Sequence, residues 1–301
     1  MTTQSKHISV CICTYKRPAW LKRLLRSVAE QEPSPQFTYS IVVADNDRLR
    51  SAEPAVKEFA ASSAVHVTYC VEPEQNIALA RNKAIENAQG DFIAFIDDDE
   101  YPAKDWLRIL FEICESYGVD GVLGPVKRHF DDQPPKWVVK GAFYDRPVQP
   151  TGVAVEWHQG RTGNLLFRKA ILNADERPFR PEFRAGEDQD FFRRMIERGH
   201  KFIWCDSAVA YEVVPPLRWK RTVMLRRALL RGATAVVHPT FGVRDIAKSV
   251  VAVPLYAVCL PFALLAGQHR FMSLLVRMFD HMGKLLALLR INPVSEQYVT
   301  E

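Results

Sequence analysis

The first hundred residues alternate short apolar runs with helical patterns, and this alternation restricts the chain to few folds. Four runs have the character of buried strands: Ile8–Thr14, Tyr39–Ala44, His66–Val71 and Asp91–Ile96. Helical patterns separate them, and the clearest begins after Asn76, a good N-cap residue, and ends before Gly90. A βαβαβαβ order folds most simply as a parallel sheet with right-handed crossovers. We therefore expect an α/β fold with helices on both faces of the sheet.

The fourth run leads directly into three consecutive carboxylates, Asp97, Asp98 and Asp99. Adjacent anions repel each other and resist removal from water, so the cluster calls for a counter-charge. A hard divalent cation would supply it and would keep positions free for phosphate oxygens. The alternative is an acidic, solvated turn. Polar clusters also follow two other strands, at Thr14–Arg17 and Asp45–Asp47, where parallel sheets bind ligands, and this favours a site.

Several classes of protein are disfavoured by what the sequence contains. It shows no glycine-rich phosphate loop, which argues against a P-loop enzyme or a dinucleotide-binding domain. The six cysteines follow no metal or disulfide spacing, so we expect free thiols in a reducing compartment. The segment Met1–His7 lacks the apolar core of a signal peptide. The catalytic part is therefore predicted to be cytoplasmic.

The net charge of +5 is modest, but basic residues concentrate between Val213 and Lys248. Eight lie there against one acidic residue, Asp245: Arg218, Lys220, Arg221, Arg226, Arg227, Arg231, Arg244 and Lys248. Nucleic acid, a nucleotide diphosphate or an anionic membrane surface would suit such a cluster. The sequence shows no nucleic-acid recognition fold, so we expect no nucleic-acid partner.

The C-terminal region has a different character from the rest of the chain. Ser249–Gly267 carries no charge over 19 residues, although Pro254 and Pro261 interrupt it. The following segment, His269–Arg290, reads as an amphipathic helix. A buried core hairpin is the alternative, but basic flanks favour attachment to a membrane surface. We expect one domain over residues 1–232 and a membrane-associating helical region over 233–301.

Over about residues 7–232 the chain resembles a family 2 glycosyltransferase with a GT-A fold. The motifs that carry the resemblance are Val10–Pro18, Ile41–Asn46, Ala80–Asn82, Gly90–Asp99, Gly163–Asn164 and Gly186–Asp188. Six motifs in the family's order are far more specific than any one alone. The resemblance implies a mostly parallel sheet flanked by helices. It also implies inverting transfer of one sugar from a nucleotide-sugar donor, with a UDP-sugar expected, in bacterial cell-surface polysaccharide synthesis.

The resemblance also implies roles for individual residues at the donor. It places nine there: Thr14, Tyr15, Arg17, Asp45, Arg81, Asp97, Asp98, Gly163 and Asn164. Asp45 would accept a hydrogen bond from the base, and Asp97 would face the ribose or diphosphate. Asp98 would assist less, because alternate strand residues point to opposite sides. Gly163 and Asn164 would border the donor sugar or the acceptor, whereas a plain turn into a strand is the alternative.

The metal would be Mg²⁺ or Mn²⁺, and the resemblance assigns it to Asp99. Many relatives place a metal-binding histidine near the end of the last core strand, where this chain has Tyr211 and Glu212. Either Glu212 supplies that contact, or the metal depends on Asp99 and the diphosphate alone.

The expected general base is Asp188, which would take the proton of the acceptor hydroxyl. Glu187 is the neighbouring candidate, and it would serve as the base itself or hold an acceptor hydroxyl. The alternative is that acidic residues simply favour a helix N-terminus. The helix itself is predicted over Phe191–Arg198, ending before Gly199.

The processive synthases of this superfamily carry Gln-x-x-Arg-Trp, and here Pro215–Trp219 reads Pro-Pro-Leu-Arg-Trp. Loss of the glutamine favours transfer of a single sugar, to a glycan or lipid-linked acceptor at the cytoplasmic face of the inner membrane. A nucleotidyltransferase of related fold is an alternative, but it would need a basic phosphate loop after the first strand. A catalytically silent membrane scaffold is another, and the carboxylates Asp97, Asp99 and Asp188 argue against it.

Overall fold

The computed structural model describes residues 5–173, 176–183, 186–237 and 240–291, and these form two compact units. The first comprises the chain up to Lys127 together with Arg146–Glu212, and the second comprises Arg128–Asp145 and the chain from Val213 onward. The predicted boundary after residue 232 differs from this division, because the helix over Arg221–Ala235 packs against the last helix. Within the predicted region 233–301, residues 238–239 and 292–301 lie outside the described residues.

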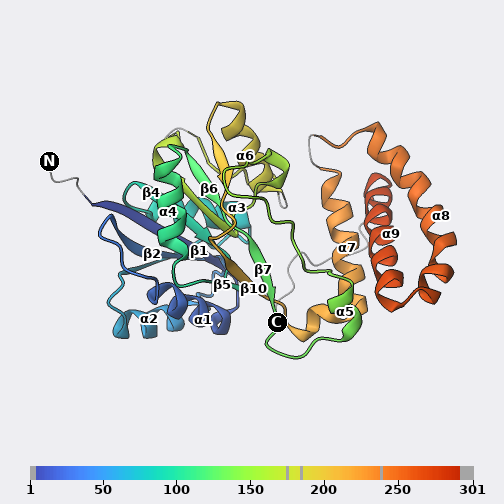
Figure 1. Cartoon of the computed structure of the whole chain (residues 1–301), viewed down its shortest axis with the longest axis horizontal. Coiled ribbons are helices and arrows are strands. Elements are labelled where there is room, and N and C mark those ends of the chain that lie inside the picture. Colours follow the sequence, from blue (N-terminus) through green and yellow to red (C-terminus); the bar gives the residue numbers. More distant parts are fainter. Residues whose placement is uncertain (1–4, 174–175, 184–185, 238–239, 292–301) are drawn as a thin grey trace. The chain divides into compact units, whose positions relative to one another are not determined.

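A seven-stranded mixed sheet forms the centre of the first unit (Figure 1). Its strands are β1 (Lys6–Thr14), β2 (Phe37–Asp45), β3 (Val67–Val71), β4 (Phe92–Ile96), β6 (Gly121–Leu123), β8 (Asn164–Arg168) and β9 (Phe202–Trp204), in the order β3-β2-β1-β4-β8-β6-β9. As predicted, β1 is parallel to β2 and β4, and β2 is parallel to β3. In contrast, β8 is antiparallel to both of its neighbours. The carboxyl ends of β1, β2 and β4 therefore meet at one edge of the sheet.

Helices cover both faces of this sheet. They are α1 (Pro18–Ala29), α2 (Glu53–Ser62), α3 (Ile77–Asn87), α4 (Trp106–Ser116) and α6 (Glu187–Glu197). Successive strand residues point to opposite faces. Val10 and Ile41 pack in one cluster with side chains of α1, α2 and α4, whereas Cys11 and Val42 pack in another with α3 and α6. Because both faces are buried, space for a ligand remains at the ends of the strands.

Two residues, Asn76 and Gly90, determine where α3 begins and how the chain turns from it into β4 and the carboxylates that follow. The side chain of Asn76 accepts hydrogen bonds from the backbone N–H groups of Ala78 and Leu79, which confirms the predicted N-cap of α3. Gly90 then turns the chain with a φ of +81°, and a Cβ there would lie 2.6 Å from the backbone oxygen of His7. A glycine is needed at this point for both its backbone angle and its close approach to β1.

A second, three-stranded sheet has the order β5-β10-β7 and consists of β5 (Glu100–Pro102), β10 (Ala210–Val213) and β7 (Val126–His129). Between β6 and β7 the chain passes from the seven-stranded sheet into this smaller one. Gly124 lies at the change, where a Cβ would come within 2.1 Å of the backbone oxygen of Ala208. Short 3₁₀ turns complete the described elements, at Trp157–Gln159, Lys169–Ile171 and Pro216–Trp219.

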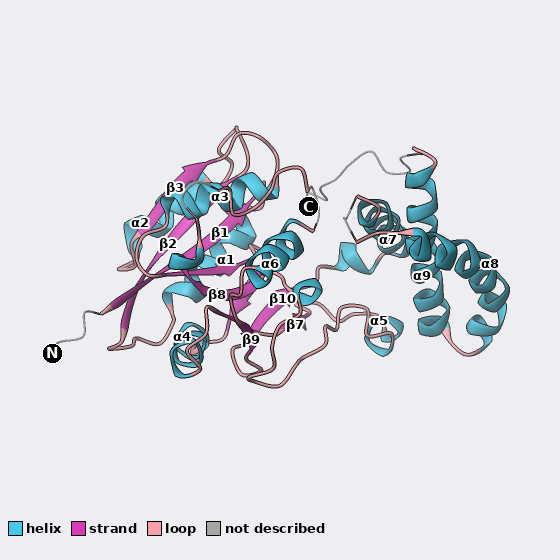
Figure 2. Cartoon of the chain, turned by 90° about the horizontal axis from the view of Figure 1, so that it is seen from above, coloured by secondary structure: helices cyan, strands magenta, loops and turns pink. Residues whose placement is uncertain are grey.

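The second unit is helical, with α5 (Lys136–Lys140), α7 (Arg221–Ala235), α8 (Val243–Leu265) and α9 (Gln268–Leu288). Within it α9 packs against both α7 and α8 and lies between them (Figure 2). Two glycines let α7 and α9 approach closely: a Cβ at Gly232 would lie 2.0 Å from the oxygen of Asp280, and one at Gly283 would lie 2.2 Å from that of Leu229. Among the described helices, α8 alone is long and apolar enough to cross a membrane.

Candidate active site

The loops that follow β1 and β4 meet at the shared edge of the sheet. Thr14 Oγ1 donates a 2.8 Å hydrogen bond to Asp98 Oδ2, and Arg17 Nη1 donates one of 3.0 Å to Asp98 Oδ1. Asp98 is buried, and this burial raises its pKa to about 6 although Arg17 opposes the shift. Between these residues, Lys16 Nζ lies 5.0 Å from the ring centroid of Tyr15. Asp98 thus joins the two loops, and both of its carboxylate oxygens accept hydrogen bonds from residues of the protein.

A group of carboxylates gathers beside this junction, and we call Asp97, Asp99, Glu100 and Glu212 the acidic cluster. Glu212 stands directly opposite Glu100 in the pairing of β10 with β5, and like charges so placed repel each other. Glu100 is 2% exposed, and burial together with the charges of Asp97 and Asp99 raises its pKa well above the usual range. A Cβ at Gly163 would lie 2.8 Å from Glu100 Oε1 and 2.9 Å from Asp97 Oδ2. Glycine at 163 therefore leaves room for these oxygens.

Two arginines that the sequence did not single out, Arg146 and Arg161, lie near the acidic cluster. Arg146 donates a hydrogen bond to Glu212 Oε2 in an ion pair. Arg161 is attracted by Asp188, Glu100 and Glu212, but it makes no hydrogen bond or ion pair with another described residue. Burial and the charge of Arg146 lower the pKa of Arg161. An unpaired guanidinium in such surroundings is suited to an anionic ligand.

The residues of the acidic cluster fit a hard cation that a ligand helps to hold. Among the described residues no three His, Cys, Asp or Glu side chains are arranged to enclose a metal. Magnesium-like cations are usually held by one or two carboxylates plus substrate phosphates, and the repulsion within the cluster is what a cation would relieve. The two predicted ligands also have cationic neighbours: Asp99 Oδ2 lies 3.6 Å from Arg17 Nη1, and Glu212 is paired with Arg146.

Arg81 links the acidic cluster to α6. It extends from α3, and its Nη2 lies 3.9 Å from Asp97 Oδ1 while its Nη1 donates a hydrogen bond to Glu187 Oε1. The side chains of Arg81 and Glu187 are 8% and 7% exposed, so this ion pair is buried. The guanidinium also lies over the ring of Phe179, 5.5 Å from its centroid. The charge of Glu187 is therefore compensated within the protein.

Asp188 differs from its neighbour Glu187 in its hydrogen bonds. Among the described residues, its one hydrogen-bond donor is the backbone N–H of Gln189, at 2.8 Å from Oδ1. Burial, followed by the charge of Glu187, raises the pKa of Asp188 to about 6. The predicted helix start at Phe191 is wrong: α6 begins at Glu187, after Gly186 in the left-handed region. Both carboxylates therefore occupy the first turn of α6, where the helix dipole stabilises negative charge.

Asp45, predicted to contact the base, is fully buried at the end of β2. Its Oδ2 accepts 2.8 Å hydrogen bonds from the Tyr69 hydroxyl and from the Ala52 N–H, and its Oδ1 accepts one from the Asp47 N–H. These contacts organise the loop after β2. Recognition of a base by Asp45 stays a prediction.

Asn164 is also fully buried, where β8 begins. Its Oδ1 accepts a 2.7 Å hydrogen bond from Trp106 Nε1, and its Nδ2 donates to the carbonyl oxygens of Pro125 and Ala208. The amide thus ties β8 to α4 and to the segments that precede β7 and β10. Of the predicted pair, the structure brings Gly163 to the acidic cluster and keeps Asn164 in the interior.

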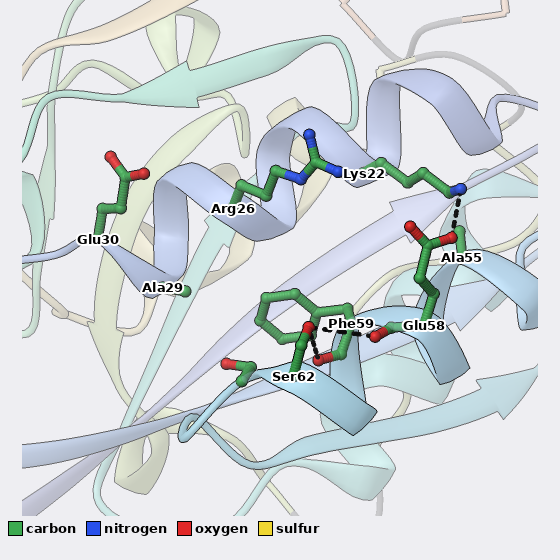
Figure 3. Close-up of a pocket in the computed structure, with 9 residues that line it drawn as sticks. Lys22, Arg26, Ala29, Glu30, Ala55, Glu58, Phe59 and Ser62 are labelled. Carbon is green, nitrogen blue, oxygen red and sulfur yellow. Dashed lines mark hydrogen bonds and ion pairs between the residues drawn. The ribbon is translucent and has the colours of Figure 1, made fainter.

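A separate pocket of about 250 Å³ lies between α1 and α2 (Figure 3). Its lining comprises Lys22, Arg26, Ala29, Glu30, Ala55, Glu58, Phe59, Ser62 and Ser63. An ion pair between Lys22 and Glu58 crosses it. None of the predicted site residues lines this pocket, so it is distinct from the acidic cluster.

Comparison of the sequence with known proteins identifies the family of this chain. The family model described as glycosyl transferase family 2 matches residues 9–175. The succinoglycan biosynthesis protein ExoM of Rhizobium meliloti (strain 1021) is 32% identical over 311 residues, which cover 99% of this chain and 97% of that protein. The glycosyltransferase AglE of Haloferax volcanii is 23% identical over 218 residues, covering 72% and 70% of the two chains.

Solved structures share the fold. The mannosyltransferase PcManGT from Pyrobaculum calidifontis, in complex with GDP-Man and Mn²⁺, has a TM-score of 0.63 at 19% identity, covering 96% of this chain and 87% of that one. Residues 1–349 of S. aureus TarS, in complex with UDP, have a TM-score of 0.54 at 18% identity, covering 92% and 88%. The mixed sheet flanked by helices therefore confirms the expected GT-A fold, and the chain belongs to glycosyltransferase family 2.

Proposed function

We propose that this glycosyltransferase moves one sugar from a nucleotide-sugar donor to a glycan or lipid-linked acceptor during cell-surface polysaccharide synthesis, with inversion and a divalent cation. Similarity to a succinoglycan biosynthesis protein along almost the whole chain supports the polysaccharide setting. UDP is the proposed nucleotide, supported by the TarS structures with UDP and UDP-GlcNAc. GDP is the competing nucleotide, because the PcManGT structure contains GDP-Man.

The observation that carries this proposal is the placement of Asp188. Its carboxylate lies next to the buried Arg81–Glu187 pair, and Arg81 in turn reaches Asp97 of the acidic cluster. The proposed base at the first turn of α6 is therefore close enough to Asp97 of the acidic cluster for their charges to interact. This is the arrangement that a displacement at a sugar phosphate requires.

In the proposed reaction, Asp188 accepts the proton of the acceptor hydroxyl while that oxygen attacks the anomeric carbon. The bond between the anomeric carbon and the phosphate oxygen breaks, and the nucleoside diphosphate leaves with the bonding electron pair. Attack from the side opposite the leaving group inverts the anomeric configuration. Glu187 is the weaker candidate for the base because Arg81 already holds its carboxylate. We assign Glu187 the task of positioning α6 against the acidic cluster.

The leaving diphosphate needs positive charge around it. A divalent cation, when bound by Asp99 beside Asp97, would neutralise part of the charge on the phosphate oxygens. Arg161 is the protein group that we assign to the same anion, because it has no partner among the described residues and its surroundings are partly dehydrated. Arg17 contributes from the β1 loop, where it also holds Asp98.

The proposed place of action is the cytoplasmic face of the membrane, where lipid-linked acceptors are found. The support is the long apolar helix α8, of which 11% of the most apolar window is buried. A catalytically silent scaffold would not need Asp188 beside the acidic cluster.

The first test is thermal stabilisation of the parent protein and of Asp99→Ala by a panel of nucleoside diphosphates, with and without Mn²⁺. A ligand present at 100 times its dissociation constant should add about 2.7 kcal/mol to the free energy of unfolding. We expect UDP with Mn²⁺ to stabilise the parent and to lose this effect in Asp99→Ala. Stronger stabilisation by GDP than by UDP would show that the donor is a GDP-sugar. Absence of stabilisation by any nucleotide would favour the alternative of a catalytically silent scaffold.

The assignment of the base needs a second measurement, in which donor binding and turnover are separated. We expect Asp188→Asn to retain stabilisation by UDP with Mn²⁺ but to transfer sugar about 10²–10⁴-fold more slowly, the usual contribution of a positioned base. Unchanged turnover in Asp188→Asn would exclude this residue as the base.

A further inference from the structure

Helix α8 presents a continuous apolar surface on the side that faces away from α9. From Val251 onward exposed side chains recur every three or four residues along it, and Val250 precedes them. Each is more than half exposed: Val250, Val251, Leu255, Val258, Phe262 and Leu265, which we call the α8 stripe. Residues on the other side of the helix, such as Ser249 and Ala252, are buried. An uninterrupted apolar surface of this length marks a site of interaction rather than an ordinary protein surface.

Exposed basic residues flank the α8 stripe at both ends. Arg244 and Lys248 lie in the first turns of α8, before the stripe begins. Arg270 is exposed in the first turn of α9, just beyond the other end. An apolar strip between cations matches an anionic lipid surface, with acyl chains for the stripe and phosphates for the cations.

The contact between α8 and α9 fixes how the cations lie relative to the α8 stripe. The chain reverses at Gly267, and α9 runs back along α8 (Figure 1). Ser249 Oγ lies 2.9 Å from His281 Nδ1, and the rings of Tyr256 and His281 are 5.9 Å apart. With this register, Arg277 on α9 is level with the middle of the α8 stripe.

The exposed side chain of Arg277 decides between two ways of meeting a bilayer. If α8 crossed the membrane with α9 packed along it, Arg277 would face lipid near the centre of the bilayer, where a charged group is strongly unfavourable. If α8 lies parallel to the surface, α9 is one helix layer, about 8–10 Å, further from the bilayer centre. An in-plane helix buries its apolar side about 5–10 Å deep, so Arg277 would then be at the level of the lipid phosphates.

We propose that α8 lies in the plane of the membrane, with the α8 stripe buried in one leaflet and with Arg270 and Arg277 against anionic lipid headgroups. The chain is thereby attached to one surface of the bilayer and does not cross it. This inference specifies the membrane attachment included in the proposed function, but it does not depend on the transfer reaction.

The test uses the purified full-length protein and sedimentation with vesicles of phosphatidylcholine alone or mixed equally with phosphatidylglycerol. We expect binding to the mixed vesicles, weaker binding at high salt, and a loss of about tenfold or more in Val258→Glu, because an apolar side chain is replaced by a charge. Val237→Glu is the matched control, since Val237 is exposed to the same 68% but lies outside the α8 stripe. Retained stabilisation by UDP with Mn²⁺ in both variants shows that the catalytic unit is folded.

Two further measurements distinguish what covers the α8 stripe: one leaflet of a membrane, a bilayer that α8 crosses, or a second copy of the chain. Alkaline carbonate should release the protein from cell membranes, and Arg277→Glu should weaken binding to the mixed vesicles. Resistance to carbonate, with no effect of Arg277→Glu, would show that α8 spans the bilayer and would overturn the proposal. Absence of vesicle binding, with a parent dimer that Val258→Glu converts to a monomer, would assign the stripe to a second copy of the chain. Failure of UDP stabilisation alone would leave this proposal standing and remove the donor-site assignment.

Discussion

The protonation state of Asp188 is expected to set the pH dependence of sugar transfer. Its pKa is raised to about 6, first by burial and then by the charge of Glu187. A protonated carboxyl group cannot accept a proton, so kcat/KM should fall by about tenfold for each pH unit below this pKa and should level off above it. The measurement is the acid limb of the pH profile of kcat/KM. An acid limb that persists unchanged in the residual activity of Asp188→Asn would assign the titration to another group.

The buried ion pair of Arg81 and Glu187 is expected to contribute to the free energy of unfolding. Glu187→Ala removes the nearest anionic partner of the buried Arg81 guanidinium and leaves the more distant Asp97, and breaking a buried pair typically costs about 3–5 kcal/mol of unfolding free energy. The double variant Arg81→Met with Glu187→Leu removes both charges, so it should be more stable than Glu187→Ala. Urea unfolding of the three proteins measures this difference. Equal stability of the single and double variants would mean that the lost charge is compensated by another group.

Arg161 is expected to act on the diphosphate and not on the nucleoside. Loss of a hydrogen bond to a charged group costs about 1.5–3 kcal/mol, so Arg161→Met should weaken UDP binding by about tenfold or more while uridine binding is unchanged. Arg108→Met is a suitable control because Arg108 lies on α4 and pairs with Glu32 and Glu112. Calorimetric titration with UDP and with uridine separates the two contributions. Equal weakening of both ligands would point to a general structural effect of the substitution.

The crossing of α7 and α9 depends on two glycines that have no room for a side chain. A Cβ at Gly283 would lie 2.2 Å from a backbone oxygen, and backbone cannot move aside as a flexible side chain does. Gly283→Ala should therefore lower the free energy of unfolding of the helical unit by about 1–3 kcal/mol or more. Gly242→Ala is the control, because nothing lies within 4 Å of a Cβ there. Proteolysis within α7–α9 should accelerate in Gly283→Ala only, and equal rates would show that the helices separate without cost.

Elements whose signals are local were predictable from the sequence. The first four strands have continuous apolar runs, and α3 has Asn76 at its start and Gly90 after its end, so their order and parallel pairing followed from pattern alone. The small sheet did not follow, because β5, β7 and β10 are three or four residues long and are defined by pairing between distant segments. The start of α6 was also missed, since the charged first turn of this helix resembles a polar loop.

Some residues of the candidate site could be chosen from the sequence, whereas others are revealed only by the folded structure. Thr14, Asp97 and Asp188 were selected as candidates because they lie at the ends of strands or just before a predicted helix, within motifs that resemble the family's. Arg146 and Arg161 come from a segment without periodicity, and only the folded chain shows that they approach the acidic cluster. Nothing in the sequence pattern of that segment distinguishes these two side chains from the other basic residues.

The division into two compact units predicts where a bound donor changes the molecule. The candidate donor residues lie in the unit that comprises the chain up to Lys127 and Arg146–Glu212. We expect UDP with Mn²⁺ to slow hydrogen exchange at Thr14–Arg17, Asp97–Glu100 and the first turn of α6, and to leave α7–α9 unchanged. Exchange measured by mass spectrometry on the parent and on Asp99→Ala tests this. Protection that extends into α7–α9 would show that the helical unit takes part in donor binding.

The ion pair between Arg81 and Glu187 also has a consequence during synthesis of the chain. The two residues are 106 positions apart, so a ribosome that adds about 5–20 residues per second makes Glu187 roughly 5–20 s after Arg81. During that interval the nascent chain already carries Arg81 and, soon after it, Asp97, but it lacks Glu187 and Asp188 of α6. With Asp188 as the proposed base, the growing polypeptide would be unable to transfer sugar until most of the first unit has been translated and folded.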